Sequence, residues 1–178
     1  MSDDAESTST SASALPQLHP LSDKWCIWAH LPQDADWSLE SYHPIMTVDT
    51  VEMATALMNK IPPNIIEKCM LFIMRQGIKP TWEDIRNRNG GSFSYKIGES
   101  HVNAVWRNLY AVLLGGTISK ANAAFTRDVT GITISPKKNF CIVKIWMTNC
   151  AHQDPSVVNP ECCLPLAGCI FKKHAPEY

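Results

Sequence analysis

The segment Pro80-Thr81-Trp82-Glu83-Asp84 places an indole beside a carboxylate, and the pair Gly90-Gly91 follows shortly after it. An indole offers a flat, electron-rich face on which another ring can stack. A carboxylate offers two oxygens that accept hydrogen bonds from the edge of that ring. Together they describe half of a site for a purine base. The alternative is a core tryptophan with a solvated neighbour, because most tryptophans are largely buried for packing reasons.

A second tryptophan, Trp37, stands in polar surroundings. It follows residues 32–36, which are rich in Pro, Ala and Asp and predict a loop. Trp82 is also expected on a loop, since the apolar run of residues 68–76 predicts a buried strand that ends before it. Loops held by a rigid scaffold commonly carry binding residues. The alternative for Trp37 is that it begins a buried strand.

Composition limits the kinds of protein this chain can be. It has 178 residues, 45% hydrophobic and 19% charged, which predicts one domain with a sizeable core. The formal net charge of -1 provides no general basic field, so any nucleic acid must be recognised at a local site. Residues 1–16 are polar and rich in Ser and Thr, which predicts a disordered acidic tail before a folded domain at 17–178.

The cysteines bear on compartment and on metal binding. Their number, seven, is odd, and the N-terminus lacks the pattern of a signal peptide, which predicts free thiols in the cytoplasm, with the nucleus left open as a second compartment. No apolar run approaches the ~18 residues of a membrane-spanning helix. A zinc module is an alternative, with candidate ligands at Cys150, His152, Cys162, Cys163 and Cys169. The spacing lacks paired Cys-x-x-Cys knuckles, so the prediction is no metal and no cofactor.

The remaining patterns predict the elements that position these residues. Strands are expected at about 19–28, 38–47, 68–76, 92–97, 129–135, 140–147 and, after an irregular stretch, near 168–172. A helix at about 49–60 has Asp49 and Glu52 in the form of a capping box, and a second, amphipathic helix at 100–114 places Trp106 in the core. Strands outnumber helices without regular alternation, which predicts an α+β domain with an antiparallel sheet and helices on one face.

A set of short motifs, in order along residues 19–148, resembles the eukaryotic translation initiation factor 4E family of mRNA cap-binding proteins. The motifs are His19-Pro20-Leu21 with Trp25 and Trp28, Trp37, Asp49-Thr50-Val51-Glu52, Pro80-Thr81-Trp82-Glu83-Asp84 with Gly90-Gly91, Trp106, and Ile145-Trp146. The resemblance implies a curved antiparallel sheet with helices on its convex face and the 7-methylguanosine cap in the concave face. It implies a protein that is not an enzyme, and no catalytic motif stands in the sequence.

The resemblance also implies a role for each candidate residue. Trp37 and Trp82 match the two tryptophans that sandwich the methylated base, and Glu83 matches the carboxylate that accepts hydrogen bonds from the guanine edge. Trp146 matches the tryptophan near the N7 methyl group. Lys137, with Lys138 close behind, matches the basic residues at the triphosphate, whereas a further phosphate-binding lysine is replaced near Ile142. Methylation at N7 gives the base a positive charge, which two indole faces attract.

On the helical side, the resemblance implies a face that binds proteins carrying a Tyr-x-x-x-x-Leu-hydrophobic motif, such as a scaffold of the initiation factor 4G type or another 4E-binding protein. The matching positions are His19, Pro20, Val51, Thr55, Arg107 and Gly115. Thr55 stands where the family has a tryptophan and Arg107 where it has a leucine, so an altered docking mode is expected. The family's third helix has no clear counterpart after residue 150.

The expected protein is a monomer that binds capped mRNA and has no membrane partner. An alternative keeps the fold but makes the protein a translational repressor or partner protein that does not bind cap. The presence of Trp37, Trp82 and Glu83 argues against that alternative.

Overall fold

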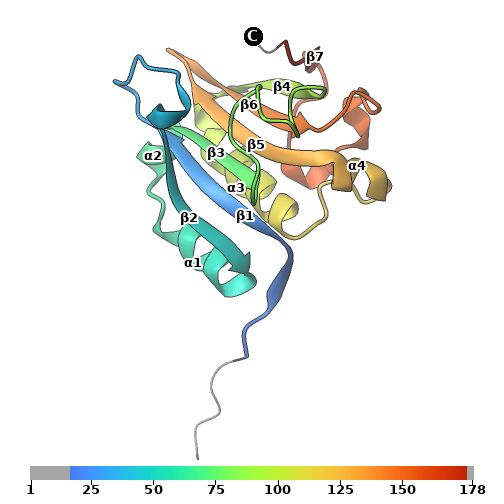
Figure 1. Ribbon diagram of the computed structural model, residues 1–178, viewed down its shortest axis with the longest axis horizontal. Helices are drawn as coiled ribbons and strands as arrows, with labels where there is room; N and C mark the ends of the chain where they lie inside the picture. The colour runs from blue at the N-terminus through green and yellow to red at the C-terminus, as the bar shows by residue number, and fades with distance from the viewer. Residues whose placement is uncertain (1–16, 176–178) are drawn as a thin grey trace, which may run out of the picture.

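Seven strands form one antiparallel sheet in the computed structural model, which describes residues 17–175. The strands are β1 (Pro20–His30), β2 (Tyr42–Thr50), β3 (Met70–Arg75), β4 (Gly91–Gly98), β5 (Val129–Pro136), β6 (Phe140–Met147) and β7 (Ile170–Lys173). Their order across the sheet is β2-β1-β3-β5-β6-β4-β7 (Figure 1). The tail predicted for residues 1–16 lies outside the described residues.

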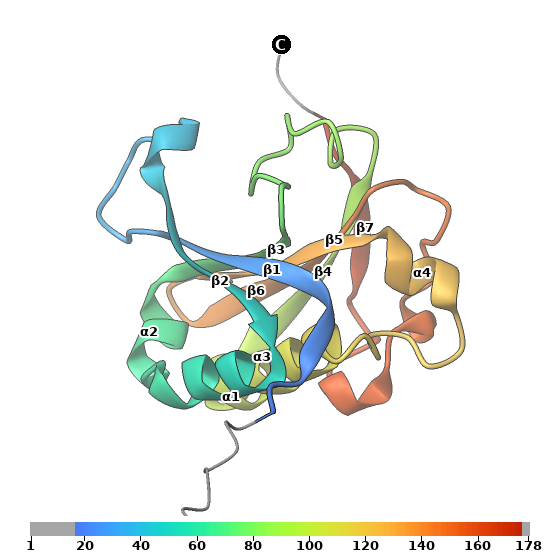
Figure 2. The ribbon, with the colours of Figure 1, turned by 60° about the horizontal axis from the view of Figure 1, so that its bottom comes forward.

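Helices cover one face of this sheet. They are α1 (Val51–Lys60), α2 (Pro63–Lys68), α3 (Glu99–Leu114) and α4 (Ala123–Asp128), with short 3-10 turns at Leu39–Ser41, Pro155–Val157 and Pro160–Cys162. In Figure 2, α1, α2 and α3 lie below the sheet, and the β1–β2 and β3–β4 connections rise above it on the other side. The predicted α+β architecture, a curved antiparallel sheet with helices on its convex face, is confirmed. No helix within residues 17–175 has the length and hydrophobicity needed to cross a membrane.

The alternation of side chains along the strands separates the two faces. Trp25 is buried in the main core beneath the helices, whereas Trp28 packs against a smaller cluster that includes Phe72 and Trp146. Successive side chains of a strand point to opposite faces, so the two tryptophans, three residues apart, lie on opposite sides of β1. The sheet therefore has a second apolar surface, on its concave side.

The start of α1 differs from the prediction. Thr50, and not Asp49, is the N-cap: its Oγ1 accepts a hydrogen bond from Met53 N at 3.2 Å. Glu52 instead interacts with His19. Its carboxylate accepts a hydrogen bond from the backbone N of His19 at 3.1 Å, and the Nδ1 atom of the His19 ring lies 2.6 Å from the other carboxylate oxygen. The predicted capping box is wrong because β2 continues to residue 50, which leaves Asp49 on the strand, 3.3 Å from the ammonium of Lys24.

Two helices of six residues, α2 and α4, were not predicted. Pro63 begins α2, because the first position of a helix needs no N–H donor. Asn122 caps α4 by accepting from Phe125 N at 2.9 Å.

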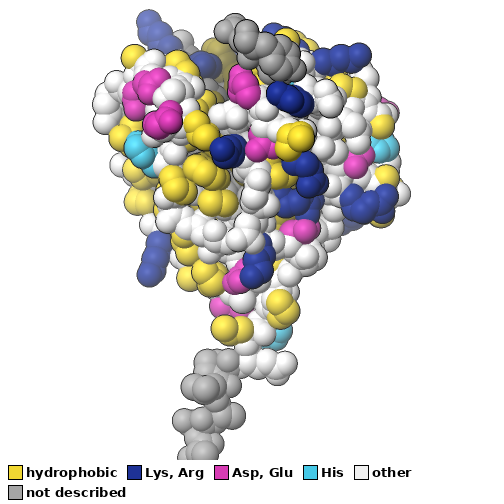
Figure 3. All heavy atoms as spheres, in the orientation of Figure 1, with side chains coloured by type: hydrophobic (Ala, Val, Ile, Leu, Met, Phe, Trp, Pro, Cys, Tyr) yellow, Lys and Arg dark blue, Asp and Glu magenta, His cyan; other side chains and the backbone are white. Residues whose placement is uncertain are grey.

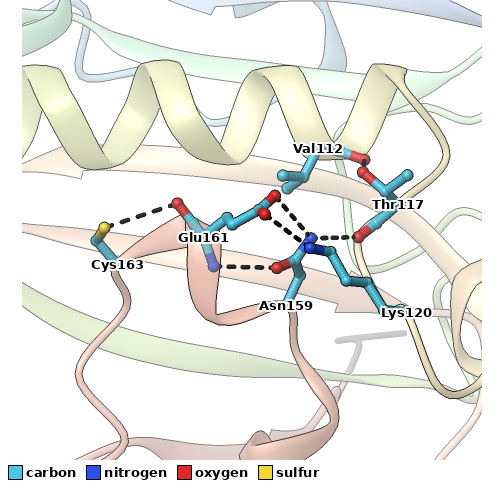
Figure 4. A network of polar contacts seen from close by, with 6 residues as sticks. All are labelled: Val112, Thr117, Lys120, Asn159, Glu161 and Cys163. Atoms are coloured by element: carbon cyan, nitrogen blue, oxygen red, sulfur yellow. Dashed lines mark hydrogen bonds and ion pairs between the residues drawn. The ribbon is translucent and has the colours of Figure 1, made fainter.

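The irregular segment after β6 is tied to the end of α3 by polar contacts (Figure 4). The side chain of Asn159 donates to the carbonyl oxygen of Thr117 at 2.8 Å, and the backbone N of Asn159 donates to that of Ile118 at 2.8 Å. Lys120 forms an ion pair with Glu161 at 2.6 Å. These contacts hold the segment in place, and β7 then pairs with β4 at the edge of the sheet.

Candidate functional site

A cavity of about 410 Å³ opens on the concave face of the sheet, between the β1–β2 and β3–β4 connections. Five residues predicted to bind line it: Trp37, Trp82, Glu83, Lys137 and Trp146. The rest of the lining consists of Tyr42, Met70, Phe72, Pro80, Thr81, Thr133, Ser135, Ile142 and Lys144. The exposed Lys138 is outside this lining. The fold thus brings together side chains that are more than a hundred residues apart in the chain.

Trp37 is held in place although its side chain is 59% exposed. Its indole stacks on the imidazole of His30, with ring centroids 4.2 Å apart and an interplanar angle of 7°. His30 is buried, and its Nε2 lies 2.8 Å from the carbonyl oxygen of Asp36. The Asp36 carboxylate accepts from the hydroxyl and the backbone N of Ser38, and these bonds lower the pKa of Asp36. The backbone is therefore fixed on both sides of Trp37. As expected from the sequence, Trp37 occupies an exposed position on a loop.

Trp82 and Glu83 lie on a loop that is cross-linked internally. The Asp84 carboxylate accepts from the backbone N of Lys79 at 2.9 Å and of Arg86 at 2.8 Å. The buried side chain of Asn87 donates to the carbonyl oxygens of Lys79 and Thr81. Asp84 and Asn87 thus shape the loop, which presents a half-buried Trp82 and an exposed Glu83 at its tip.

Glycine is required at positions 90 and 91 because the loop returns very close to the sheet there. A Cβ atom on Gly90 would lie 1.7 Å from the carbonyl oxygen of Met147, and one on Gly91 would lie 2.8 Å from that of Lys172. Both distances are far below van der Waals contact. Side chains here would push β4 away from β6 and β7, and with it the loop that carries Trp82.

Trp146 forms part of the cavity floor. It is buried, and its Nε1 donates to the hydroxyl of Thr133 on the neighbouring strand at 2.8 Å. Its ring also contacts that of Phe72 edge-on, with centroids 6.5 Å apart. The single polar atom of the indole is therefore satisfied within the sheet, and the ring is fixed in orientation.

His174, just after β7, was missed by the sequence analysis. Its ring stacks on Trp82 at a centroid distance of 5.7 Å and an angle of 10°, and it lies 4.9 Å from the ring of Trp146. Nδ1 is 2.7 Å from the carbonyl oxygen of Asn87, while Nε2 is buried without a partner among the described residues. Burial lowers the pKa of His174, so the neutral ring is favoured. No local pattern around residue 174 predicts that it supports Trp82.

Lys144, on β6, was also missed, although a pattern could have identified it. It is two residues before Trp146, so the alternation of a strand places both on the concave face. Its Nζ lies 5.7 Å from the ring centroid of Trp82. Burial, and then the charges of Lys172 and Lys137, lower the pKa of Lys144. The cavity wall therefore carries a half-buried ammonium in addition to the predicted Lys137.

The other end of the cavity has the opposite charge. Burial, and then the negative charges of Glu83 and Asp36, raise the pKa of Tyr42. These acidic groups stand on the two loops, while the lysines stand on β6, β7 and the β5–β6 turn. On the face seen in Figure 3, acidic side chains gather on the β1–β2 connection at the upper left. A ligand with a cationic end and an anionic end would be oriented by this separation.

The chain matches a known family model, described as eukaryotic initiation factor 4E, over residues 20–159. The chain belongs to the initiation factor 4E family. This is a family of translation initiation factors and not of enzymes, in agreement with the prediction from sequence. The match begins at the first residue of β1 and includes every residue of the cavity lining.

Relatives in the initiation factor 4E family are distant. Eukaryotic translation initiation factor 4E of Candida albicans is 30% identical over 139 residues, which cover 74% of this chain and 66% of that protein. Factor 4E-1 of barley, Hordeum vulgare, is 26% identical over 162 residues, covering 88% and 73%. The human factor is 25% identical over 142 residues, covering 76% and 64%. The chain is thus a divergent member of the family.

Solved structures agree on the fold. A complex of C. elegans eIF4E-3 with the 4E-binding protein Mextli and a cap analog superposes with a TM-score of 0.78 at 19% identity, covering 89% of this chain and 94% of that chain. Ascaris suum eIF4E-3 in complex with an m7G cap superposes with a TM-score of 0.77, also at 19% identity, covering 90% and 94%.

A second groove, on the helical side, contains most of the positions that match the family's partner face. This groove of about 310 Å³ lies between α1 and α3 and includes Val51, Thr55, Arg107 and Gly115. Its remaining lining is Leu21, Ala54, Met58, Asn59, Tyr110, Ala111 and Leu114. His19 and Pro20 lie outside this lining, at the start of β1.

Arg107 has a structural role within this groove. Its guanidinium donates to the carbonyl oxygens of Met58 at 2.6 Å and Ile61 at 3.0 Å, at the C-terminal end of α1. Tyr110, one turn further along α3, donates to the carbonyl oxygen of Ala54 at 2.9 Å. The positive charge therefore caps a helix terminus and does not project freely into the groove, whereas Thr55 is exposed.

Within the described residues, the cysteines do not form a metal site. All seven are free, and within residues 17–175 no three His, Cys, Asp or Glu side chains are close enough to hold a metal ion. Cys162 is buried, which raises its thiol pKa to about 12, whereas Cys163 is exposed. The zinc module left open by the sequence has no cluster of ligands in this part of the chain.

Proposed function

We propose that this chain binds the 7-methylguanosine cap of mRNA and acts in translation initiation or its regulation. The observation that carries the proposal is the single cavity lined by two loop tryptophans, a loop carboxylate and a buried floor tryptophan: Trp37, Trp82, Glu83 and Trp146. The structurally similar eIF4E-3 proteins of C. elegans and Ascaris suum, solved in complex with a cap analog and with an m7G cap, support it.

In this proposal the methylated base lies between the indoles of Trp37 and Trp82. Its positive charge is attracted by both ring faces. Glu83 accepts hydrogen bonds from the N1 and N2 groups of guanine, and Trp146 contacts the N7 methyl group. Lys137, with Lys138 beside it in the β5–β6 turn, meets the phosphates.

The expected energies suit a ligand of micromolar affinity or better. Stacking of a base on an aromatic side chain contributes about 1 to 3 kcal/mol, and a hydrogen bond to a charged group about 1.5 to 3 kcal/mol. Two stacks and the Glu83 contact reach roughly the 8 kcal/mol of a micromolar complex at the upper end of these ranges, before the cost of association. The phosphate contacts offset part of that cost.

A titration of tryptophan fluorescence with 7-methyl-GTP and with GTP tests the proposal. We expect quenching by 7-methyl-GTP at micromolar concentration or below, and little response to GTP, since GTP lacks the charge on the base. Equal responses to the two nucleotides, or none, would contradict it and favour the alternative of a paralogue that does not bind cap.

We also propose that a 4E-binding protein or a scaffold of the initiation factor 4G type docks on the groove between α1 and α3. Structurally similar eIF4E proteins were solved in complex with the 4E-binding protein Mextli and with a 4E-BP, which supports this proposal. The docking mode differs from that of the family pattern, because Thr55 provides no aromatic wall and Arg107 is engaged by α1.

A further inference from the structure

Two lysines line the cavity, and a third stands on β7 at the edge of the same sheet. Lys144 lines the cavity from β6 and Lys137 from the β5–β6 turn. Lys172 stands on β7, opposite Ser92, which in turn pairs with Trp146 on β6. Both Lys172 and Lys137 are close enough to Lys144 to lower its pKa by repulsion. The three charges therefore act on a common volume of the site.

These lysines have no counter-charge within the described part of the chain. No carboxylate of residues 17–175 lies within 4 Å of Lys137, Lys144 or Lys172, whereas Lys24 and Lys120 each have an acidic partner. Lys144 is also half-buried. A partly desolvated ammonium without a counter-charge is unfavourable, and like charges around it add to the cost. An anion bound among the three lysines would lower this cost.

The acidic end of the cavity indicates which part of a ligand would carry this negative charge. Glu83 and Asp36 act on Tyr42, on the loop side. A cationic base held there directs the other end of the same molecule toward the lysines. The family resemblance places a phosphate-binding lysine at Ile142, which also lines the cavity. Lys144, two residues further along the same face of β6, supplies a charge on the same wall.

We propose that Lys144 and Lys172 complete, with Lys137, a subsite for the phosphate chain of the cap, in which Lys144 makes the contact nearest to the base. The proposal rests on the proposed function, since it assumes a methylated guanine between the tryptophans. In this subsite, Lys144 provides the positive charge that Ile142 lacks. Lys172 extends the positive wall along β7 toward the later phosphates.

The test measures how affinity grows with each phosphate. Wild-type protein, Lys144→Met, Lys144→Arg and Lys172→Met are titrated with 7-methylguanosine and with its mono-, di- and triphosphate. Lys60→Met, in α1 on the helical side, makes the same change of charge away from the cavity and serves as the control.

We expect Lys144→Met to bind the nucleoside within about twofold of wild type and the triphosphate at least 10-fold more weakly, as for a lost hydrogen bond to a charged group. Lys144→Arg should recover most of this loss, and Lys172→Met should lose affinity mainly for the di- and triphosphate. The dependence of affinity on salt should be weaker in both Met variants. Lys60→Met should match wild type.

Two results would overturn the subsite. An equal loss for nucleoside and triphosphate would mean that Lys144 only supports the ring of Trp82. Tighter binding of the nucleoside by Lys144→Met would mean that the ammonium competes with the base for that ring. A wild-type protein that binds inorganic triphosphate through Lys144 but no methylated ligand would overturn the proposed function and leave the anion subsite standing.

Discussion

The indole of Trp37 lies parallel to the buried imidazole of His30, with 4.2 Å between ring centroids. Trp82 is supported in the same way by His174, at 5.7 Å and 10°. Each tryptophan proposed to hold the base therefore has one face covered by a histidine. The site is prepared before the ligand arrives, which reduces the ordering cost of binding.

The first prediction concerns this support. His30→Ala should weaken binding of 7-methyl-GTP by about 1 kcal/mol, close to fivefold, because a stacked aromatic pair contributes roughly 0.5 to 1.5 kcal/mol. The measurement is a fluorescence titration combined with an unfolding curve. His43→Ala, on an exposed position of β2, should change neither quantity. A folded His30→Ala variant with wild-type affinity would show that the histidine does not position Trp37.

The second prediction separates binding tryptophans from core tryptophans. Trp37→Ala and Trp82→Ala should each cost about 1 to 3 kcal/mol in affinity for 7-methyl-GTP and leave the fold intact. Trp25→Ala, by contrast, empties a buried position and should cost about 3 to 5 kcal/mol in the free energy of unfolding. Denaturant unfolding and nucleotide titration of all three variants check this. Unfolding of the Trp37 or Trp82 variant would place that residue in the core and refute the sandwich.

The third prediction concerns Glu83. Glu83→Gln should weaken 7-methyl-GTP binding by about 1.5 to 3 kcal/mol, because the hydrogen bonds of the base lose a charged acceptor. Stability should change little, since Glu83 is exposed. Glu40→Gln, an exposed position on the other loop, is the matched control.

The same variant has a second readout that needs no ligand. The negative charge of Glu83 helps to raise the pKa of Tyr42, so Glu83→Gln should lower that pKa, which an absorbance titration at alkaline pH detects. An unchanged tyrosine titration would mean that Glu83 points away from the cavity.

The fourth prediction concerns pH. The pKa of His174 lies below 6.5 in the folded protein because burial disfavours the charged ring. At pH values between the pKa of His174 in the folded protein and its pKa in the unfolded chain, the unfolded chain binds more protons than the folded protein. The free energy of unfolding therefore rises with pH in this window. The free energy of unfolding should therefore fall as the pH is lowered below 6.5, and quenching by 7-methyl-GTP should weaken in parallel as Trp82 loses its support.

His174→Phe isolates this contribution, since it keeps an aromatic ring beside Trp82 but cannot titrate. Its free energy of unfolding should change less than that of wild type between pH 7.5 and pH 5.5. His101→Gln, an exposed position on α3, should keep the wild-type dependence. Identical pH dependence in wild type and His174→Phe would exclude His174 as the titrating group.

The fifth prediction concerns the partner groove. Arg107→Leu removes two charge-assisted hydrogen bonds at the end of α1 and should destabilise the protein by about 1.5 to 3 kcal/mol. Thr55→Trp together with Arg107→Leu should nevertheless increase the affinity for a peptide with the Tyr-x-x-x-x-Leu-hydrophobic motif. Fluorescence anisotropy of a labelled peptide measures this, with Lys60→Met as the control. Tight binding of that peptide by wild-type protein would contradict an altered docking mode.

Local sequence patterns predicted much of the architecture. Apolar runs bounded by turn residues predicted all seven strands, and the periodicity of residues 100–114 predicted α3, which spans Glu99–Leu114. The Asp49–Glu52 capping box failed because the same short motif suits either a strand end or a helix start, and pairing of β2 with β1 decided between them. The six-residue helices α2 and α4 are too short for an amphipathic repeat to show.

The sequence by itself determined which chemical groups are available to the candidate site, because the indoles, the carboxylate and the ammonium are set by residue type at Trp37, Trp82, Glu83 and Lys137. Only the tertiary structure decided that Trp37, Trp82 and Trp146 line one cavity, since that depends on the order of strands across the sheet. It alone brought His174 to Trp82 and placed Lys172 near Lys144. Side-chain patterns report on neighbours along the chain, whereas these contacts join residues that only the pairing of β4 with β6 and β7 brings together.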